Sequence, residues 1–291
     1  MRISLSKGSL CAAVQTGGGE LVSLQREGTE YIWSGDPAFW SGQNPILFPI
    51  VGSLKEGKTT LSGKVFEMAR HGFARRMEFQ LTEQGEDWAV LTLRESPETL
   101  AQFPYAFSLQ VRHQLGEDGF STSFTVKNPN ETPMPFCIGA HTAIRCPLEA
   151  GERFEDYELA FSQPENADTL LLTPAGLLRP GAAEPMLRNG TVPLDYETFR
   201  RLDTLIFQGL QSGQAALRHK ETGRGVSLDF QAFPVVAFWT KPGAPFLCME
   251  PWQGCAAYEN ESGLFQDKPH VLTLAPGEAK TLAYRFRLLN G

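Results

Sequence analysis

Apolar and polar residues alternate with a period of two along most of the chain, and this pattern predicts β-strands. Between residues 107 and 126, two alternating segments flank Gly116-Glu117-Asp118-Gly119, which is typical of a hairpin turn. Similar segments separated by glycine or proline recur along the chain. The strands that we expect are Ser9–Val14, Leu21–Gln25, Ala89–Arg94, Phe107–Leu115, Phe120–Val126, Ala216–His219, Val226–Phe230, Val235–Trp239, Phe246–Met249, Val271–Leu274 and Thr281–Leu288.

Helical patterns are limited to two short segments, around Pro97–Gln102 and Tyr196–Arg201. Many short strands with glycine and proline turns predict an all-β protein of packed antiparallel sheets, either a sandwich or a barrel. The sequence has no internal repeat, low-complexity linker or break in composition, so we expect one domain over residues 1–291. Pro133–Pro135 and Pro180–Pro193 are predicted to be loops within it.

The net charge of -7 argues against nucleic acid as a partner, although a local arginine cluster could still bind a small anion. No segment has the length and apolar character of a membrane span, and residues 1–14 lack the apolar core of a signal peptide. We therefore expect a cytoplasmic protein, a monomer or a homodimer, without a membrane partner. Its five cysteines contain no C-x-x-C pair and are expected to be reduced and mostly buried: Cys11, Cys137, Cys146, Cys248 and Cys255.

Three segments combine side chains suited to chemistry with apolar surroundings: 71–75 (HGFAR), 137–141 (CIGAH) and 246–252 (FLCMEPW). Glu250 ends an apolar strand pattern, where burying an unpaired carboxylate is costly. Such a glutamate needs either a hydrogen-bonding shell or a function. Taken alone, the sequence around His71 and His141 favours hydrogen-bonded core histidines over functional ones, and His113, which alternates in register with apolar neighbours, is expected to face the core.

Other chemistries have weaker support in the sequence. Two histidines and one carboxylate can hold a non-haem iron, but no H-x-D or H-x-x-x-H spacing is present, so we expect no metal. The sequence lacks a G-x-S-x-G elbow, a phosphate-binding loop and a dinucleotide fingerprint, so we expect no nucleotide cofactor. A glycosidase would need a second embedded carboxylate beside Glu250, and none stands out.

The order of four motifs resembles the aldose 1-epimerase (galactose mutarotase) family, in particular its bacterial LacX-like branch. These motifs are 44–52 (NPILFPIVG), 71–75 (HGFAR), 138–148 with its I-G-x-H and C-P-L segments, and 248–252 (CMEPW). The resemblance implies a large antiparallel β-sandwich with the sugar site on a concave face, and it implies no cofactor. It also implies that His141 is the acid, that Glu250 is the base and that His71 lines the site. Contacts to the sugar are expected from Arg75, Asp203, Asn44, Trp252 and Lys55.

Anomer exchange by such a site needs a base for the C1 hydroxyl and an acid for the ring oxygen. At pH 7 an ordinary carboxylate is ionised and an ordinary imidazole is near its pKa, which suits these roles. The chain departs from the resemblance at Ser53, where arginine is usual, and at Thr142, Ile144 and Arg145 after His141. Two alternatives therefore stay open. One is a sugar-binding sensor that has lost turnover, which Ser53 favours. The other is a hexose-6-phosphate 1-epimerase, which is favoured by the basic residues Lys55, Arg75, Arg76 and Arg145.

Overall fold

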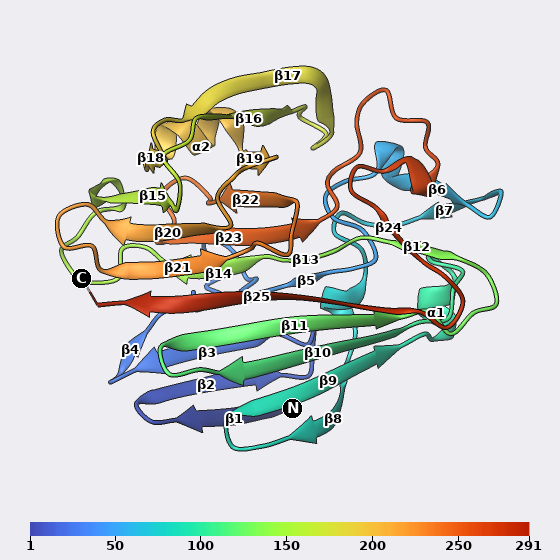
Figure 1. The fold of residues 1–291 in the computed structure, drawn as a ribbon, viewed down its shortest axis with the longest axis horizontal. Helices are drawn as coiled ribbons and strands as arrows, with labels where there is room; N and C mark the ends of the chain where they lie inside the picture. Colours follow the sequence, from blue (N-terminus) through green and yellow to red (C-terminus); the bar gives the residue numbers. More distant parts are fainter. Residues whose placement is uncertain (291) are drawn as a thin grey trace.

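The computed structural model describes residues 1–290 and is built mainly of antiparallel sheets (Figure 1). The largest sheet has nine strands. In spatial order they are β18 (Thr191–Pro193), β15 (Tyr157–Phe161), β20 (Gln214–His219), β21 (Gly225–Asp229), β25 (Ala279–Leu289), β11 (Gly119–Lys127), β10 (Ser108–Leu115), β9 (Trp88–Arg94) and β8 (Gln80–Gln84).

A second, six-stranded sheet packs on the nine-stranded one. Its strands are β19 (Thr204–Gln208), β22 (Val235–Trp239), β23 (Phe246–Gln253), β13 (Ile138–Ala140) and β5 (Ile46–Leu47), with β14 (Thr142–Arg145) also pairing with β23. Apolar residues from both sheets form one buried cluster, and the rings of Phe161 and Phe238 lie 5.9 Å apart across the layers. The chain therefore has the predicted all-β, sandwich-like architecture.

Smaller sheets and short helices surround these two layers. The N-terminal sheet contains β1 (Arg2–Lys7), β2 (Leu10–Gln15), β3 (Leu21–Arg26) and β4 (Thr29–Glu30). Three two-stranded sheets pair β6 (Lys58–Leu61) with β7 (Lys64–Glu67), β12 (Met134–Phe136) with β24 (Leu272–Leu274), and β16 (Ala167–Leu172) with β17 (Leu178–Leu187). The helices are α1 (Pro97–Leu100), α2 (Tyr196–Leu202) and the 3-10 turns η1 (Lys55–Gly57), η2 (Ala74–Arg76), η3 (Phe154–Asp156) and η4 (Phe265–Asp267). Within residues 1–290, no helix has both the length and the apolar composition needed to span a membrane.

The predicted strands and both predicted helices are present, with ends that differ by a few residues. The two predicted loops are wrong in part, because β12 covers Met134–Phe136 and β17 covers Leu178–Leu187. Each of these strands pairs with a single neighbour. Proline is tolerated at such an edge because the missing N–H can face away from the ladder.

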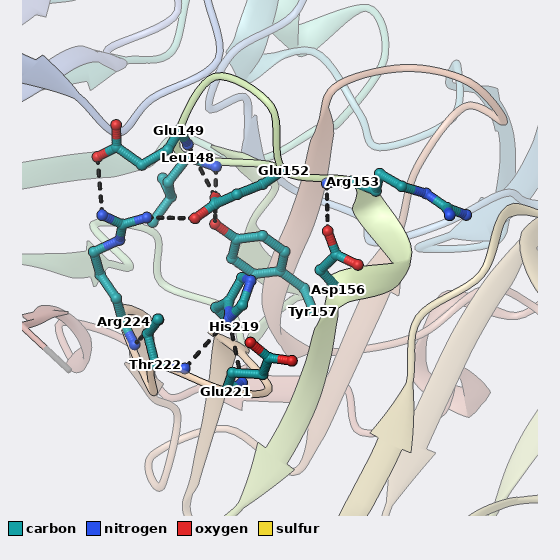
Figure 2. Close-up of polar contacts among 10 residues, drawn as sticks. All are labelled: Leu148, Glu149, Glu152, Arg153, Asp156, Tyr157, His219, Glu221, Thr222 and Arg224. Atoms are coloured by element: carbon teal, nitrogen blue, oxygen red, sulfur yellow. Dashed lines mark hydrogen bonds and ion pairs between the residues drawn. The ribbon is translucent and has the colours of Figure 1, made fainter.

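Polar residues from the chain segment between β14 and β21 form a cluster of hydrogen bonds and ion pairs (Figure 2). The Glu152 carboxylate accepts hydrogen bonds from the Tyr157 hydroxyl and from Arg224, each at 2.5 Å. His219 Nδ1 accepts weaker bonds from two backbone amides of the adjacent turn. The cluster fastens the loop after β14 to the turn between β20 and β21.

Candidate active site

His141 and Glu250 are brought together by the register of three strands. Strand β13 pairs with β23 so that Gly139 lies opposite Trp252, and β14 pairs with β23 so that Thr142 lies opposite Met249. Both ladders have the same register, which places His141, between β13 and β14, directly across from Glu250. Side chains opposite one another on one face of a sheet have Cβ atoms only about 5 Å apart.

The strand that carries Glu250 is longer than predicted, because β23 continues from Phe246 through Pro251 to Gln253. Glu250 is therefore in the middle of the strand and does not end it. Pro251 falls where β13 gives way to β14, so its missing N–H removes no bond from those two ladders. All eight residues of β23 are buried, which encloses the carboxylate on a strand covered on both faces.

The Glu250 carboxylate faces His141 with one oxygen and is anchored through the other. Glu250 Oε1 lies 3.4 Å from His141 Nε2, and Oε2 accepts a hydrogen bond of 3.2 Å from the Trp252 indole N–H. Burial raises the pKa of Glu250 well above its usual value, with a nearby Arg70 opposing this shift. Burial also lowers the pKa of His141 to about 3. Both shifts disfavour charge, so the ordinary protonation states expected from the sequence do not apply to the empty cavity.

The neutral pair and the ion pair contain the same number of protons. A protonated Glu250 beside a neutral His141 becomes a carboxylate beside an imidazolium when one proton crosses the 3.4 Å between Oε1 and Nε2. The short distance suits the ion pair, whereas burial favours the neutral form. We attribute the neutral form to the free protein, since charged groups at this depth have lost their water.

His71 is held in one tautomer by the backbone of a neighbouring segment. The backbone N–H of Gly52 donates to His71 Nδ1 at 3.1 Å. In return, the backbone N–H of His71 donates to the Gly52 carbonyl at 2.9 Å. Burial lowers the pKa of His71 well below its usual value, so the ring is neutral and carries its proton on Nε2. Its ring lies 5.7 Å from that of His141. His71 is thus a fixed hydrogen-bond donor beside His141.

His71 lies in a turn with left-handed backbone. Its φ of 67° and that of 71° at Gly72 are both in the left-handed region. A Cβ on Gly72 would lie 2.2 Å from the Phe48 carbonyl oxygen, so only glycine fits there. Phe73 is buried under this turn, with its ring 6.0 Å from that of Phe48.

Two arginines and an aspartate lie around the mouth of the same hollow. Arg70 Nη2 is 4.0 Å from Asp203 Oδ2, and both side chains are about half exposed. Asp203 ends α2 with a φ of 62°, and it accepts a hydrogen bond of 2.9 Å from the Thr204 hydroxyl. Arg75, from η2, is half-buried and lies near the carboxyl group of Glu20.

These residues line a cavity that is open to solvent and contains about 580 Å³ of space, part of which is the solvent at its mouth. Trp40 and Trp239 form an aromatic wall, with ring centres 4.9 and 5.6 Å from that of His141. The cavity is lined by Trp40, Arg70, His71, Arg75, His141, Asp203, Thr204, Trp239, Glu250 and Trp252. Polar groups on one strand face and aromatic faces beside them are suited to a polyhydroxylated ligand.

The model of the aldose 1-epimerase family matches residues 1–287 of the chain. The chain belongs to the aldose 1-epimerase family. It is 36% identical to the chromosomal LacX protein of Lactococcus lactis subsp. lactis over 303 aligned residues, with all of both chains covered. A galactose mutarotase-like protein from Lactobacillus casei has a TM-score of 0.93 and 28% identity, covering 99% of this chain and 100% of that one. A galactose mutarotase related enzyme from Lactobacillus acidophilus has a TM-score of 0.94 at 24% identity, covering 100% and 98%.

Six of the eight site residues predicted for this aldose 1-epimerase family member line the cavity: His71, Arg75, His141, Asp203, Glu250 and Trp252. The structure does not bring Asn44 and Lys55 to it. Asn44 is buried behind the site, where its side-chain oxygen accepts a bond of 2.6 Å from Thr142. Lys55 is exposed and lines a separate surface hollow.

Arg70, Trp40 and Glu20 are part of the site or its support, and the sequence analysis assigned no role to them. Arg70 directly precedes His71, and its guanidinium carbon would be 3.8 Å from a Cβ on Gly176, beside the hydroxyl of Ser53. Arg70 therefore occupies space next to the position where the family usually has arginine. Its place beside the HGFAR motif was the available signal, whereas Trp40 lies in a loop that carries no local pattern.

Proposed function

We propose that this member of the aldose 1-epimerase family is a mutarotase, which interconverts the α and β anomers of an aldose by opening and closing the ring. The observation that carries the proposal is the 3.4 Å separation of His141 Nε2 and Glu250 Oε1 on the wall of an open cavity. A base and an acid on neighbouring atoms can reach O1 and O5 of one hemiacetal together, because both oxygens are bonded to C1.

In the proposed opening step, the Glu250 carboxylate takes the proton from O1 while the C1–O5 bond breaks and C1=O1 forms. The electron pair of the broken bond goes to O5, which receives a proton from His141. Rotation about C1–C2 turns the other face of the aldehyde to O5, and closure reverses both transfers. The step needs no redox partner, because no atom changes its net oxidation state.

Burial of the pair favours the opening step once a proton has moved from Glu250 to His141 and formed the ion pair from which that step starts. Opening converts the imidazolium and carboxylate into a neutral imidazole and a neutral acid, which is the form that desolvation stabilises. The cost of burying charge therefore falls as the ring opens. His71, fixed as an Nε2–H donor, would stabilise the negative charge that develops on the ring oxygen or on a neighbouring hydroxyl.

The remaining lining groups would bind the sugar without taking part in the proton transfers. Asp203 and Arg70 offer an acceptor and a donor to hydroxyl groups at the cavity mouth. Trp40, Trp239 and Trp252 present aromatic surface on which C–H groups of a pyranose can pack. We infer a small-molecule sugar as the ligand, action in the cytoplasm, and a monomer or homodimer that needs neither nucleic acid nor membrane.

Exchange NMR between the anomers of a panel of aldoses tests the proposal directly. We expect catalytic amounts of the protein to transfer magnetisation between α and β signals of at least one free aldose. A sugar-binding sensor of the same fold would instead shift or broaden the signals of its ligand without exchanging them. Binding without exchange across the whole panel would contradict the mutarotase and favour the sensor.

A hexose-6-phosphate 1-epimerase is a second candidate, supported by the two arginines that line the cavity. Arg70 and Arg75 bring positive charge to the opening of a protein whose net charge is -7. Of the other basic residues considered, Lys55 and Arg76 are exposed outside the cavity lining, and Arg145 points to the backbone of β4.

Replacing Arg70 by glutamine separates the two substrate classes. If the substrate is phosphorylated, Arg70→Gln should raise KM for glucose 6-phosphate by about 10-fold or more, because a charge-assisted hydrogen bond is lost, while kcat changes little. If the substrate is a free sugar, the variant should lose a similar and small amount of activity on both compounds. The exposed Arg76→Gln variant is the matched control and should leave both constants unchanged.

A further inference from the structure

Cys248 completes a trio of potential metal ligands with His141 and Glu250. It lies two residues before Glu250 on β23 and therefore points to the same face of the strand. One ligand atom from each of the three residues, a thiol sulfur, an imidazole nitrogen and a carboxylate oxygen, lies within 4.8 Å of the other two. All three residues are buried: His141 and Glu250 line the cavity, and Cys248 lies behind its aromatic wall, in a buried cluster against which Trp40 and Trp239 pack.

The distances are close to those of tetrahedral zinc coordination. With metal–ligand bonds of about 2.0–2.1 Å to nitrogen and oxygen, two ligands of a tetrahedron lie about 3.4 Å apart. The observed separation of His141 Nε2 and Glu250 Oε1 is 3.4 Å. The Cys248 sulfur lies within 4.8 Å of one ligand atom of each partner, whereas a sulfur bonded to zinc at about 2.3 Å would lie about 3.6 Å from each, so binding would draw the thiol inwards.

Two of these side chains also contain buried polar atoms without a partner among the described residues. Glu250 Oε1 and His141 Nδ1 both lack a hydrogen bond, and Glu250 is only 1% exposed. A buried oxygen acceptor without a donor is costly and marks a position where a ligand is favoured. Two anionic ligands and one neutral imidazole would balance the charge of a divalent cation, with the displaced protons released to solvent.

We propose that His141, Cys248 and Glu250 form a binding site for a soft divalent cation, of which Zn²⁺ is the best match. Thiolate and imidazole ligands favour zinc over magnesium or calcium, and three protein ligands leave a fourth position open towards the cavity for water. The site goes beyond the proposed reaction, which uses no metal, and it replaces the expectation of no metal that rested on sequence spacing, because the fold brings Cys248 next to His141 and Glu250. Because the cation occupies the proposed acid and base, its binding inhibits ring opening.

Cobalt binding tests the site without reference to activity. Co²⁺ replaces Zn²⁺ in tetrahedral sites and gives a sulfur-to-cobalt charge-transfer absorption when a thiolate is among the ligands. We expect the protein, titrated with Co²⁺ without oxygen, to develop this band with one equivalent of metal, and Zn²⁺ to abolish it. Cys248→Ala should weaken the affinity by at least about 100-fold, since even residues that only support metal ligands are worth about 10–100-fold.

Two control variants distinguish this site from the other thiols. Cys11 is exposed and Cys255 is buried in a different apolar cluster, so Cys11→Ser and Cys255→Ala should both keep the band. Circular dichroism establishes that each variant is folded. Absence of the band in the wild-type protein, or its persistence in folded Cys248→Ala, would overturn the proposal, as would a band that depends on Cys11.

The prediction that Zn²⁺ inhibits ring opening rests on the proposed mutarotase function, so it is tested by a separate measurement. Zn²⁺ should slow mutarotation by the wild-type protein, a chelator should restore the rate, and Cys248→Ala should keep its rate in the presence of Zn²⁺. If the protein shows no mutarotation but the cobalt band behaves as predicted, the proposed reaction fails and the metal site stands. Metal binding without any effect on a measurable mutarotation rate would contradict the placement of the cation on the acid/base pair.

Discussion

The hydrogen bond from the Gly52 amide to Nδ1 determines what His71 can do. Because Nδ1 is an acceptor and the ring is neutral, the Nε2–H can only donate into the cavity. We predict that His71→Ala lowers kcat for mutarotation by about 10²-fold, the typical loss when one fixed donor to a developing charge is removed. Polarimetry on freshly dissolved sugar measures this rate.

His113 provides the matched control for that variant. It is also buried, but its ring nitrogens lie at hydrogen-bond distance from Thr122 and from the Gly19 carbonyl, away from the cavity lining. His113→Ala should lower stability and leave the rate per folded molecule close to that of the wild type. Equal losses of rate in both variants would show that His71 acts only through folding.

Glycine at position 72 is required by a close contact as well as by its dihedral angle. Gly72→Ala would place a Cβ 2.2 Å from the Phe48 carbonyl oxygen, whereas Gly63→Ala, at a similar φ of 75°, meets no atom within 4 Å. The left-handed conformation alone costs about 1–2 kcal/mol. We predict that urea unfolding shows a loss of about this size for Gly63→Ala and a loss larger by at least about 2 kcal/mol for Gly72→Ala. Similar losses would mean that the turn moves away from β5 without cost.

At the scale of elements, Glu20 links the start of β3 to the back of the active site. Glu20 is only 8% exposed, and its carboxylate accepts a hydrogen bond of 3.1 Å from the backbone N–H of Asn44. Burial raises the pKa of Glu20 to about 7. The folded protein therefore holds a proton on Glu20 between about pH 4.5 and 7 that the unfolded chain releases. Stability contributed by this group is greatest below that interval and falls as the pH rises through it.

Glu20→Gln should remove this pH dependence. A glutamine stays neutral and can still accept from the Asn44 amide, so we predict that its stability, relative to the wild type, rises by up to about 3 kcal/mol between about pH 5 and pH 8. Urea unfolding of both proteins across this interval measures the difference, in which the titrations of all other groups cancel. A difference that does not change with pH would contradict the assigned pKa.

Strand positions were predictable from the sequence where alternation is strong, as in β10 and β11, because one face of each strand packs into the core. The prolines of β12 and β17 led to a prediction of loops, because proline argues against a central strand. Both are edge strands, which tolerate proline. Strands β13 and β14 are only three and four residues long and carry no periodic signal. Their shared register on β23, which sets His141 against Glu250, is a property of tertiary structure.

At the scale of the whole molecule, the charge distribution differs from the composition. The protein has a net charge of -7, yet the cavity is lined by two arginines, and its two carboxylates have different surroundings. Asp203 is about half exposed, whereas Glu250 is buried. Six of the eight predicted site residues line the cavity, whereas Asn44 and Lys55 lie outside its lining, because neighbours in a motif need not point to the same side.

The six-stranded sheet holds the proposed base on β23 and the proposed acid between β13 and β14, and surrounding turns carry several of the proposed sugar-binding groups. Glu250 belongs to β23, while His71 and Asp203 come from turns with left-handed backbone. Rigid strands fix the proton-transfer distance, and the turns determine which hydroxyl arrangement fits. We expect substitutions on the turns to change the preferred sugar and substitutions of the pair to change the rate on every sugar.

The central claim is that His141 and Glu250 transfer the two protons of ring opening. Polarimetry of freshly dissolved glucose and galactose, with the wild type and the variants His141→Asn and Glu250→Gln, tests it most directly. We predict that each variant lowers kcat by at least about 10²-fold on any sugar that the wild type converts, while circular dichroism shows an intact fold. Near-wild-type rates in either folded variant would contradict the account.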